Sequence, residues 1–193
     1  MHEVPHARSA GHLCRERSPV RSASGPLLRE ERVQRMSSPN KPVTPAREQL
    51  IKDLNEDLAR EYQAIIAYVV YSQQLKGAQY MAIAKELEKH AGEELSHALT
   101  VAKHIDYLGG TPVAAALPVK QSDDAQTMLR ADLENENETI RAYRRRVAQC
   151  ESMGEYAIAE DIREILRQEQ EHQSDLATAL GEDAPDVSEP AAK

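Results

Sequence analysis

The sequence contains no Trp and no Phe, and only two of its 193 residues are Cys. Cys14 and Cys150 lie far apart and form no CxxC motif, which argues against a disulfide scaffold, a thiolate zinc site and a redox dithiol. This cysteine usage is typical of the reducing cytoplasm, where we expect the protein. No apolar run approaches the ~18–20 residues of a membrane span, so we expect no membrane partner.

Basic residues are also in the minority. Asp and Glu number 32 against 24 Lys and Arg, which gives a net charge of −8. An acidic surface disfavours nucleic acid as the main partner and is compatible with cations. The run of three Arg at 144–146 is therefore expected to be a solvated face and not a nucleic-acid patch.

The two ends of the chain lack a periodic apolar pattern. Residues 1–45 are rich in Arg, Ser and Pro, and residues 181–193 are acidic and contain Pro, so we expect both to be disordered. The first segment lacks the apolar core of a signal peptide. We expect translation to start at Met36, where an ordinary polar N-terminus begins. If the Arg-rich piece is translated, it can supply phosphate contacts that are independent of sequence.

Between these ends, residues 46–180 predict one domain of four long helices. Thr44 and Pro45 supply an N-cap and a proline at the first helical position, and Asp123 with Gln126 resembles a capping box. Glycines mark the helix ends. The connection between the second and third helices is long and suits a crossover in a bundle. The expected helices span 46–76, 79–108, 123–152 and 155–180.

Each expected helix carries an apolar stripe whose members are alternately four and three residues apart, the spacing of an antiparallel bundle. One Glu lies near the middle of every stripe, and in the second and fourth helices a His follows it three residues later. Glu94 follows Glu61 by 33 residues, as Glu169 follows Glu136, so the helix pair repeats with an offset of 75. The six polar stripe residues are Glu61, Glu94, His97, Glu136, Glu169 and His172.

These residues predict a di-metal site in the core. Burying even one unpaired carboxylate costs several kcal/mol, whereas two divalent cations cancel four carboxylates charge for charge. Two imidazoles add neutral nitrogen ligands, and an oxygen-rich set suits iron or manganese better than structural zinc. The alternative is that each Glu-x-x-His is an ordinary surface pair, or that the polar stripe is only structural.

The residues around this set have less specific interpretations. His90 and His104 are expected to be solvated or to support the ligands from behind, and Glu93 and Glu171 to point outward. Neighbouring hydrogen bonds would fix the imidazole tautomers, and Asp161 and Glu164 are the candidates. Tyr68 lies two turns from Glu61 on the same stripe, either as plain core or within reach of the metals.

Four sequence blocks resemble bacterioferritin and its ferritin-like relatives: LNEDLAREYQAIIAY (54–68), EELSHA (93–98), MLRADLENE (128–136) and EILRQEQEH (164–172). Ferritin-like di-iron bundles hold their metals with the same ligand set, so the resemblance implies an all-α, antiparallel ferritin-like four-helix bundle with a long crossover. It also implies two Fe ions per chain, with Mn as the alternative metal. Glu61 and His97 would bind one ion, Glu136 and His172 the other, and Glu94 and Glu169 would bridge them.

The same resemblance assigns a role to Tyr68, which matches a tyrosine near the family's di-iron centre that supplies an electron or a hydrogen bond. Two departures matter. Leu95 stands where bacterioferritin has its haem-ligating Met, so no haem is predicted there. An acidic tail stands in place of the fifth helix that lines the pores of the 24-subunit cage, so a homo-oligomer in the form of a twelve-subunit shell or a dimer remains open.

The resemblance implies a ferroxidase that oxidises Fe(II) with O2 or H2O2 and stores Fe(III) mineral. The alternatives on the same ligands are a di-metal peroxidase, a manganese catalase, or an oxygenase of a small or quinone substrate. A rubrerythrin-type peroxidase normally carries paired CxxC motifs, which this chain lacks. A third hypothesis is a non-catalytic bundle, which predicts little loss of stability on chelation.

Overall fold

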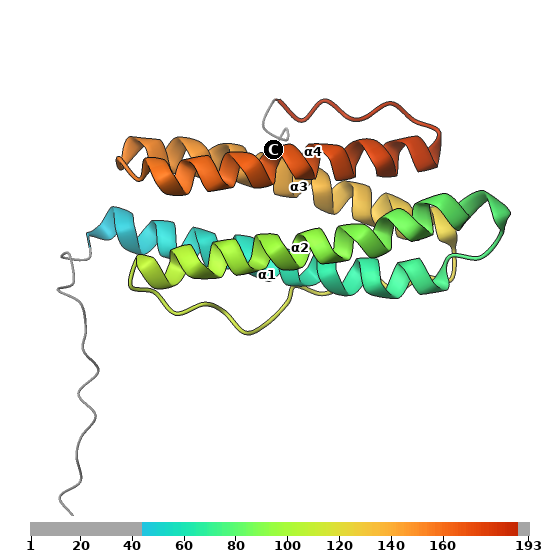
Figure 1. Cartoon of the computed structure of the whole chain (residues 1–193), viewed down its shortest axis with the longest axis horizontal. Coiled ribbons are helices and arrows are strands. Elements are labelled where there is room, and N and C mark those ends of the chain that lie inside the picture. The colour runs from blue at the N-terminus through green and yellow to red at the C-terminus, as the bar shows by residue number, and fades with distance from the viewer. Residues whose placement is uncertain (1–43, 189–193) are drawn as a thin grey trace, which may run out of the picture. The chain divides into compact units, whose positions relative to one another are not determined.

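A computed structural model describes residues 44–188, which form a bundle of four long helices. The helix α1 (Pro45–Gln74) packs along α2 (Met81–Tyr107), and α3 (Ala125–Ser152) packs along α4 (Tyr156–Leu180). The two hairpins meet through α1 against α3 and α2 against α4 (Figure 1). A short 3-10 helix, η1 (Ala78–Tyr80), precedes α2. The predicted all-α four-helix bundle is confirmed, while the expectations for residues 1–43 and Met36 lie outside the described residues.

The helix ends follow local capping chemistry. Thr44 accepts a hydrogen bond from the backbone N–H of Arg47 and Pro45 is the first helical residue, as predicted. At α3 the prediction is wrong by one residue: Asp124, not Asp123, is the N-cap, because its extended backbone lets its carboxylate accept from Thr127 N at 2.7 Å. Gly154, with φ of 72°, makes the left-handed turn that joins α3 to α4.

The segment between α2 and α3 is a crossover that runs along α1 (Figure 1). Leu117 donates its backbone N–H to the carbonyl oxygen of Ala59 at 3.0 Å. Asn55 accepts from Val113 N at 2.7 Å, and Gln63 donates to the carbonyl of Pro118 at 2.6 Å. These bonds satisfy the backbone of an extended segment, as surface connections require. The crossover brings α3 back to the opposite end of the bundle.

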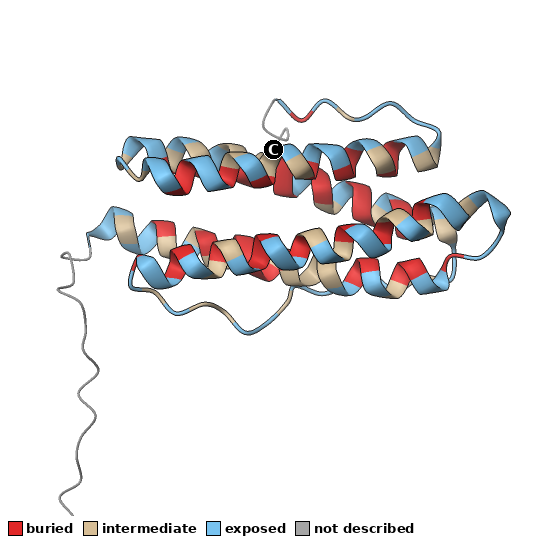
Figure 2. Cartoon of the chain, in the orientation of Figure 1, coloured by how far each residue is buried: buried red, intermediate tan, exposed pale blue. Residues whose placement is uncertain are grey.

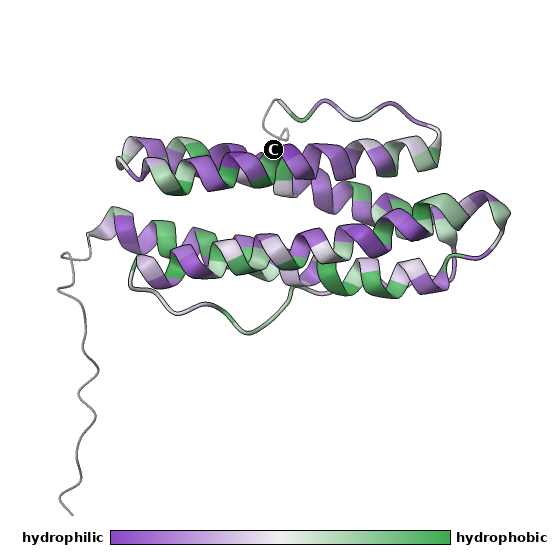
Figure 3. Ribbon diagram, in the orientation of Figure 1, coloured by the Kyte–Doolittle hydropathy of each residue, from purple (hydrophilic) through white to green (hydrophobic). Residues whose placement is uncertain are grey.

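The predicted stripes form the core, and Figure 2 shows buried positions along the inward faces of all four helices. One apolar cluster includes Leu50, Val101 and Ile162, and a second includes Leu87 and Leu129. Four stripe positions are only partly buried: Ile65, Ala91, Val147 and Ala179. Figure 3 shows that hydrophilic residues interrupt the hydrophobic ones along the helices. On each helix, the polar stripe residues lie between the residues of one apolar cluster and those of the other.

The Arg run is not a solvated face throughout, which corrects the expectation from the sequence. Arg146 is buried, and its Nε donates to Asp57 Oδ2 at 2.7 Å. Pairing with an acid on α1 makes this burial possible. Arg146 therefore connects α3 to α1 through the core.

Part of the C-terminal segment packs on the bundle. The side chain of Gln173 donates to the carbonyl of Pro185 at 3.2 Å, and Val187 is buried. Residues 189–193 lie outside the described part, so the expected disorder of 181–193 stays a prediction for them. No helix between residues 44 and 188 is long and apolar enough to cross a membrane.

Candidate metal centre

The structure brings all six polar stripe residues together in the core. Glu61 comes from α1 and Glu136 from α3, whereas α2 and α4 each provide a Glu and a His three residues apart. Residues three apart share one helix face, so each of these pairs points at the same place. None of the six is more than 2% exposed. Their roles as ligands are taken up below as a proposal.

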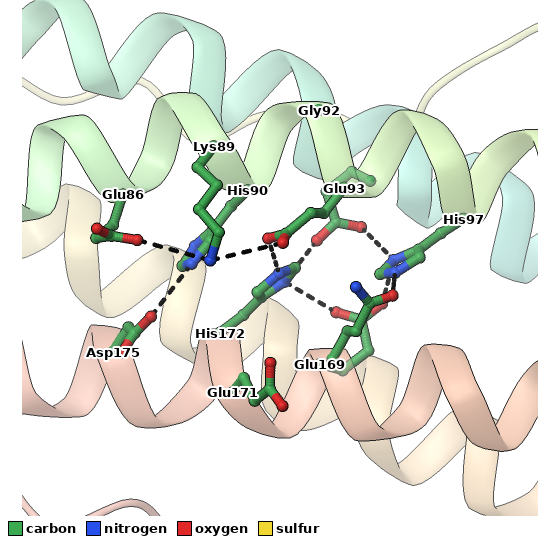
Figure 4. A network of polar contacts seen from close by, with 12 residues as sticks. Glu86, Lys89, His90, Gly92, Glu93, His97, Glu169, Glu171, His172 and Asp175 are labelled. Carbon is green, nitrogen blue, oxygen red and sulfur yellow. Dashed lines mark hydrogen bonds and ion pairs between the residues drawn. The ribbon is translucent and has the colours of Figure 1, made fainter.

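Two of the four carboxylates span both imidazoles (Figure 4). Glu94 places Oε1 2.8 Å from His172 Nδ1 and Oε2 3.2 Å from His97 Nδ1. Glu169 does the reverse, with Oε1 3.0 Å from His97 Nδ1 and Oε2 3.4 Å from His172 Nδ1. Both Nδ1 atoms therefore face the same pair of carboxylates. This is the arrangement that two bridging ligands require.

The remaining two carboxylates complete two overlapping groups. Within each group, one ligand atom per residue lies within 4.8 Å of all the others. The first group is Glu61, Glu94, His97 and Glu169, and the second is Glu94, Glu136, Glu169 and His172. Because Glu94 and Glu169 belong to both groups, the arrangement suits two cations side by side.

Several buried oxygens of this cluster have no hydrogen-bond partner within residues 44–188. They are Glu61 Oε2, Glu94 Oε1, Glu136 Oε2 and both carboxylate oxygens of Glu169. Buried polar atoms are normally satisfied, and an unsatisfied one signals strain, catalysis or a missing ion. Carboxylate oxygens with imidazole nitrogens are a donor set that Fe and Mn accept. The residues therefore fit a pair of such ions.

The shifted pKa values of the cluster residues reflect the same crowding of charge. Burial, and then the charges of Glu94 and Glu169, raise the pKa of Glu61 well above its ordinary value. Burial and the same two carboxylates also raise the pKa of Glu136. Burial opposes charge on His172, but the adjacent carboxylates of Glu169 and Glu94 outweigh it and raise the pKa of His172 to about 11. Without cations, protons take over part of the charge compensation.

Two tyrosine hydroxyl groups contact the carboxylates of the cluster from behind. Tyr68 donates its hydroxyl to Glu136, and Tyr143 donates to Glu61. Of these, the sequence analysis singled out Tyr68 but not Tyr143. The offset of 75 residues that relates Glu61 to Glu136 also relates Tyr68 to Tyr143, and this signal would have found it.

The outer nitrogens of the two imidazoles have different partners. His97 Nε2 lies 2.9 Å from Gln168 Oε1, and His172 Nε2 lies 3.1 Å from Glu93 Oε2. The expectation that Glu93 points outward is therefore wrong, because its carboxylate turns in toward His172. Gln168 was missed, since an amide between two predicted faces carries no distinct sequence signal.

The other candidates near the centre separate into two types. Asp161 pairs with His104 at 2.8 Å, so it does not orient a ligand imidazole. Glu164 pairs with Arg167 on the exposed face of α4. His90 is buried and stacks on His172, with ring centroids 4.0 Å apart. Burial, and then the charge of His172, lower the pKa of His90 to about 4.

A family model for the ferritin-like domain matches residues 51–184. The chain belongs to the ferritin-like family. It is 28% identical over 124 residues to the bacterioferritin of Desulfovibrio desulfuricans, covering 64% of this chain and 69% of that protein. The bundle also resembles a ferritin-like, diiron-carboxylate protein from Bacillus anthracis, with a TM-score of 0.69, 33% identity and coverage of 71% and 99% of the two chains.

A second solved structure is similar to this ferritin-like chain. It is a dodecameric thioferritin, the bacterioferritin-related protein of Bacteroides fragilis. The TM-score is 0.64 at 27% identity, and the match covers 70% of this chain and 86% of that one. The predicted resemblance to bacterioferritin and its relatives is confirmed at the level of the family.

Proposed function

We propose that this ferritin-like protein is a di-iron ferroxidase that oxidises Fe(II) to Fe(III) with O2 or H2O2, for iron storage and detoxification. The observation that carries the proposal is the pair of overlapping ligand groups that share Glu94 and Glu169. Membership in the family, with a diiron-carboxylate relative at 33% identity, adds support.

In this proposal the substrate ions occupy the two groups. Glu61 and His97 bind one Fe(II), Glu136 and His172 bind the other, and the two shared carboxylates bridge them. The two Fe(II) ions would together supply two electrons to O2. In this reaction 2 Fe(II), O2 and 2 H⁺ yield 2 Fe(III) and H2O2. Manganese is the alternative metal, because the same oxygen-rich donors accept it.

The chain's own residues would orient the ligands. The hydroxyl groups of Tyr68 and Tyr143 hold the two terminal carboxylates, Glu136 and Glu61. Contacts of Gln168 and Glu93 with the outer nitrogens turn both Nδ1 atoms inward. Such outer partners fix the tautomer and ring orientation of a ligand His. Tyr68 remains the proposed catalytic residue. Its hydroxyl, which donates to Glu136, would supply a hydrogen bond or an electron.

Storage would need an enclosed space, so we propose a homo-oligomer. The Bacteroides relative is described as dodecameric, and large apolar side chains lie exposed on α1 and α2, among them Ile66, Val69, Leu95 and Leu99. A second copy of the chain is the proposed partner for these exposed side chains. Light scattering of the purified protein tests the assembly. Because Leu95 stands where bacterioferritin has its haem-ligating Met, we still expect no haem at that site. The cytoplasm remains the expected location.

An aerobic Fe(II) titration of the metal-free protein, followed by near-ultraviolet absorbance, tests the function. We expect a fast rise with a break near about two iron per chain, followed by slower growth as mineral forms. A break at two without further uptake would favour a di-metal peroxidase, a manganese catalase or a small-substrate oxygenase. No protein-dependent oxidation would overturn the ferroxidase.

A further inference from the structure

A second polar cluster lies between α2 and α4, outside the two ligand groups of the centre. It consists of Glu86 and His90 on α2 and Asp175 on α4 (Figure 4). One ligand atom from each residue lies within 4.8 Å of the other two. None of the three belongs to the groups that contain Glu61 or Glu136. Two carboxylates and one imidazole thus converge beside the centre, and the same imidazole also forms a group with Glu93 and His172.

His90 is the residue that makes this cluster more than a group of surface acids. It is 1% exposed, and neither ring nitrogen has a hydrogen-bond partner in the described part of the chain. Its Nε2 lies 3.3 Å from Asp175 Oδ2, within ion-pair distance but without the alignment of a hydrogen bond. A buried imidazole without partners is costly. Coordination of a cation would satisfy it.

The cluster can be reached from solvent. The side chains of Glu86 and Asp175 are 45% and 46% exposed. Both line a surface pocket of ≈ 210 Å³, together with residues of η1, α2 and the end of α4. The ammonium group of Lys89 lies nearby, with Nζ 3.8 Å from Glu86 Oε2 and 3.6 Å from Glu93 Oε1. The ammonium group of Lys89 therefore already pairs with one carboxylate of the cluster, that of Glu86.

The internal repeat does not account for the cluster. A shift of 75 residues maps His90 onto Ile165, and it maps Thr100 onto Asp175. The shift also maps Glu86 onto Asp161, another acid, so an apolar residue and an uncharged one stand at two of the three matching places of the other half. The cluster exists on one side of the bundle only, so it is not a by-product of the symmetry that builds the di-metal centre.

We propose that Glu86, His90 and Asp175 form a third site for a divalent transition-metal cation, separate from the di-metal centre. One nitrogen and two carboxylate ligands suit Fe(II), Mn(II), Co(II) or Zn(II). The site borders the centre, because His90 stacks on His172. The ammonium of Lys89 competes with the bound cation.

A Co(II) titration by calorimetry tests the site without any redox step. We expect about three Co(II) per intact chain, two of them in the centre. The double variant Glu86→Gln/Asp175→Asn should lose the third step or weaken it by at least about tenfold. Both residues are half exposed, so the fold should persist. The matched control is Glu88→Gln/Glu171→Gln, which makes the same charge change at exposed positions of the same helices and should keep all three steps.

A third step that is missing from the unchanged protein, or equal in the double variant and the control, would overturn the proposal. Lys89→Gln gives an independent readout, because removal of a like charge close to a divalent cation should tighten the third step by at least about fivefold. Lys85→Gln, one turn away on α2, should leave it unchanged. If Fe(II) oxidation fails but the third Co(II) still depends on Glu86 and Asp175, this site stands and the ferroxidase falls.

Discussion

The hairpin of α1 and α2 and the hairpin of α3 and α4 are two versions of one design, offset by 75 residues. Their hydroxyl contacts cross over: Tyr68 of the first hairpin donates to Glu136 of the second, and Tyr143 of the second donates to Glu61 of the first. Each hairpin therefore supplies proposed ligands and contacts those of its partner. The centre exists only when the two hairpins are packed together.

One turn away from the ligands the two halves differ. Asp57 and Asp132 are corresponding buried acids. Asp57 binds the buried guanidinium of Arg146, but the residue that matches Arg146 in the first half is Tyr71, whose hydroxyl donates to the carbonyl of Lys120. Asp132 Oδ2 is left without a hydrogen-bond partner within residues 44–188. Symmetry is retained at the ligands, where two similar ions would need it, and is lost beside them.

The largest effect should come from the carboxylates that both halves share. Glu94→Gln and Glu169→Gln each remove a ligand that spans both imidazoles, so each should slow Fe(II) oxidation by at least about 100-fold. The two losses should be similar, because the residues are equivalent by the 75-residue offset. Stopped-flow absorbance measures the initial rate, with Glu88→Gln as the control. A variant that keeps the fast phase would show that its carboxylate is not shared.

The convergence of the six polar stripe residues was predictable because their chemistry and their periodicity agree. A Glu within an apolar stripe contradicts burial unless something compensates its charge, and four such residues at equal spacings point to one cause. The partners behind the ligands were harder to predict. Gln168 and Glu93 lie at the edges of the inward faces, so whether they turn in depends on the rotation of each helix, which the spacing does not specify.

The next largest effect should come from the ion pair between Asp57 and Arg146, which has no counterpart at Asp132. Asp57→Asn should destabilise the protein by about 3 kcal/mol, because it leaves the buried guanidinium of Arg146 with weaker compensation. Asp53, 3.0 Å from Arg146 Nη1, retains part of the charge pairing, which keeps the cost from being larger. Urea denaturation at fixed protein concentration measures it. A change below about 1 kcal/mol would mean that the pair behaves as an exposed one.

The two tyrosines give a smaller and symmetric test. Tyr68→Phe and Tyr143→Phe each remove one hydroxyl donor from a terminal carboxylate, and each should lower Fe(II) affinity at its own half by about tenfold. The ring volume stays, so the fold should change little. Metal binding by calorimetry compares the two, with Tyr62→Phe as the control outside the centre. If Tyr68→Phe instead slows oxidation at unchanged affinity, Tyr68 takes part as an electron donor, and the halves differ in function.

The sequence indicated burial at most stripe positions, but it did not reveal which polar groups would find partners. Asp57 and Asp132 both precede a buried Leu on matching stripes. Arg60 pairs with Asp57 at 3.2 Å from three residues away, but no neighbour in the sequence indicates the pair with Arg146. Arg146 reaches Asp57 from another helix, 89 residues away. Such pairing depends on the contact between α1 and α3, which is a tertiary feature and has no local periodicity.

The smallest effect should come from the unpaired acid. Burial, and then the charge of Glu94, raise the pKa of Asp132 well above its ordinary value. The folded state therefore prefers the protonated acid, and the stability it contributes is present below the ordinary pKa and is lost as pH rises through the raised one. Asp132→Asn mimics the neutral form, so it should change little near pH 4 and stabilise the metal-free protein by about 1 kcal/mol near pH 8. Urea denaturation at both pH values measures this, and a loss of stability at the higher pH would show that Asp132 has a cationic partner after all.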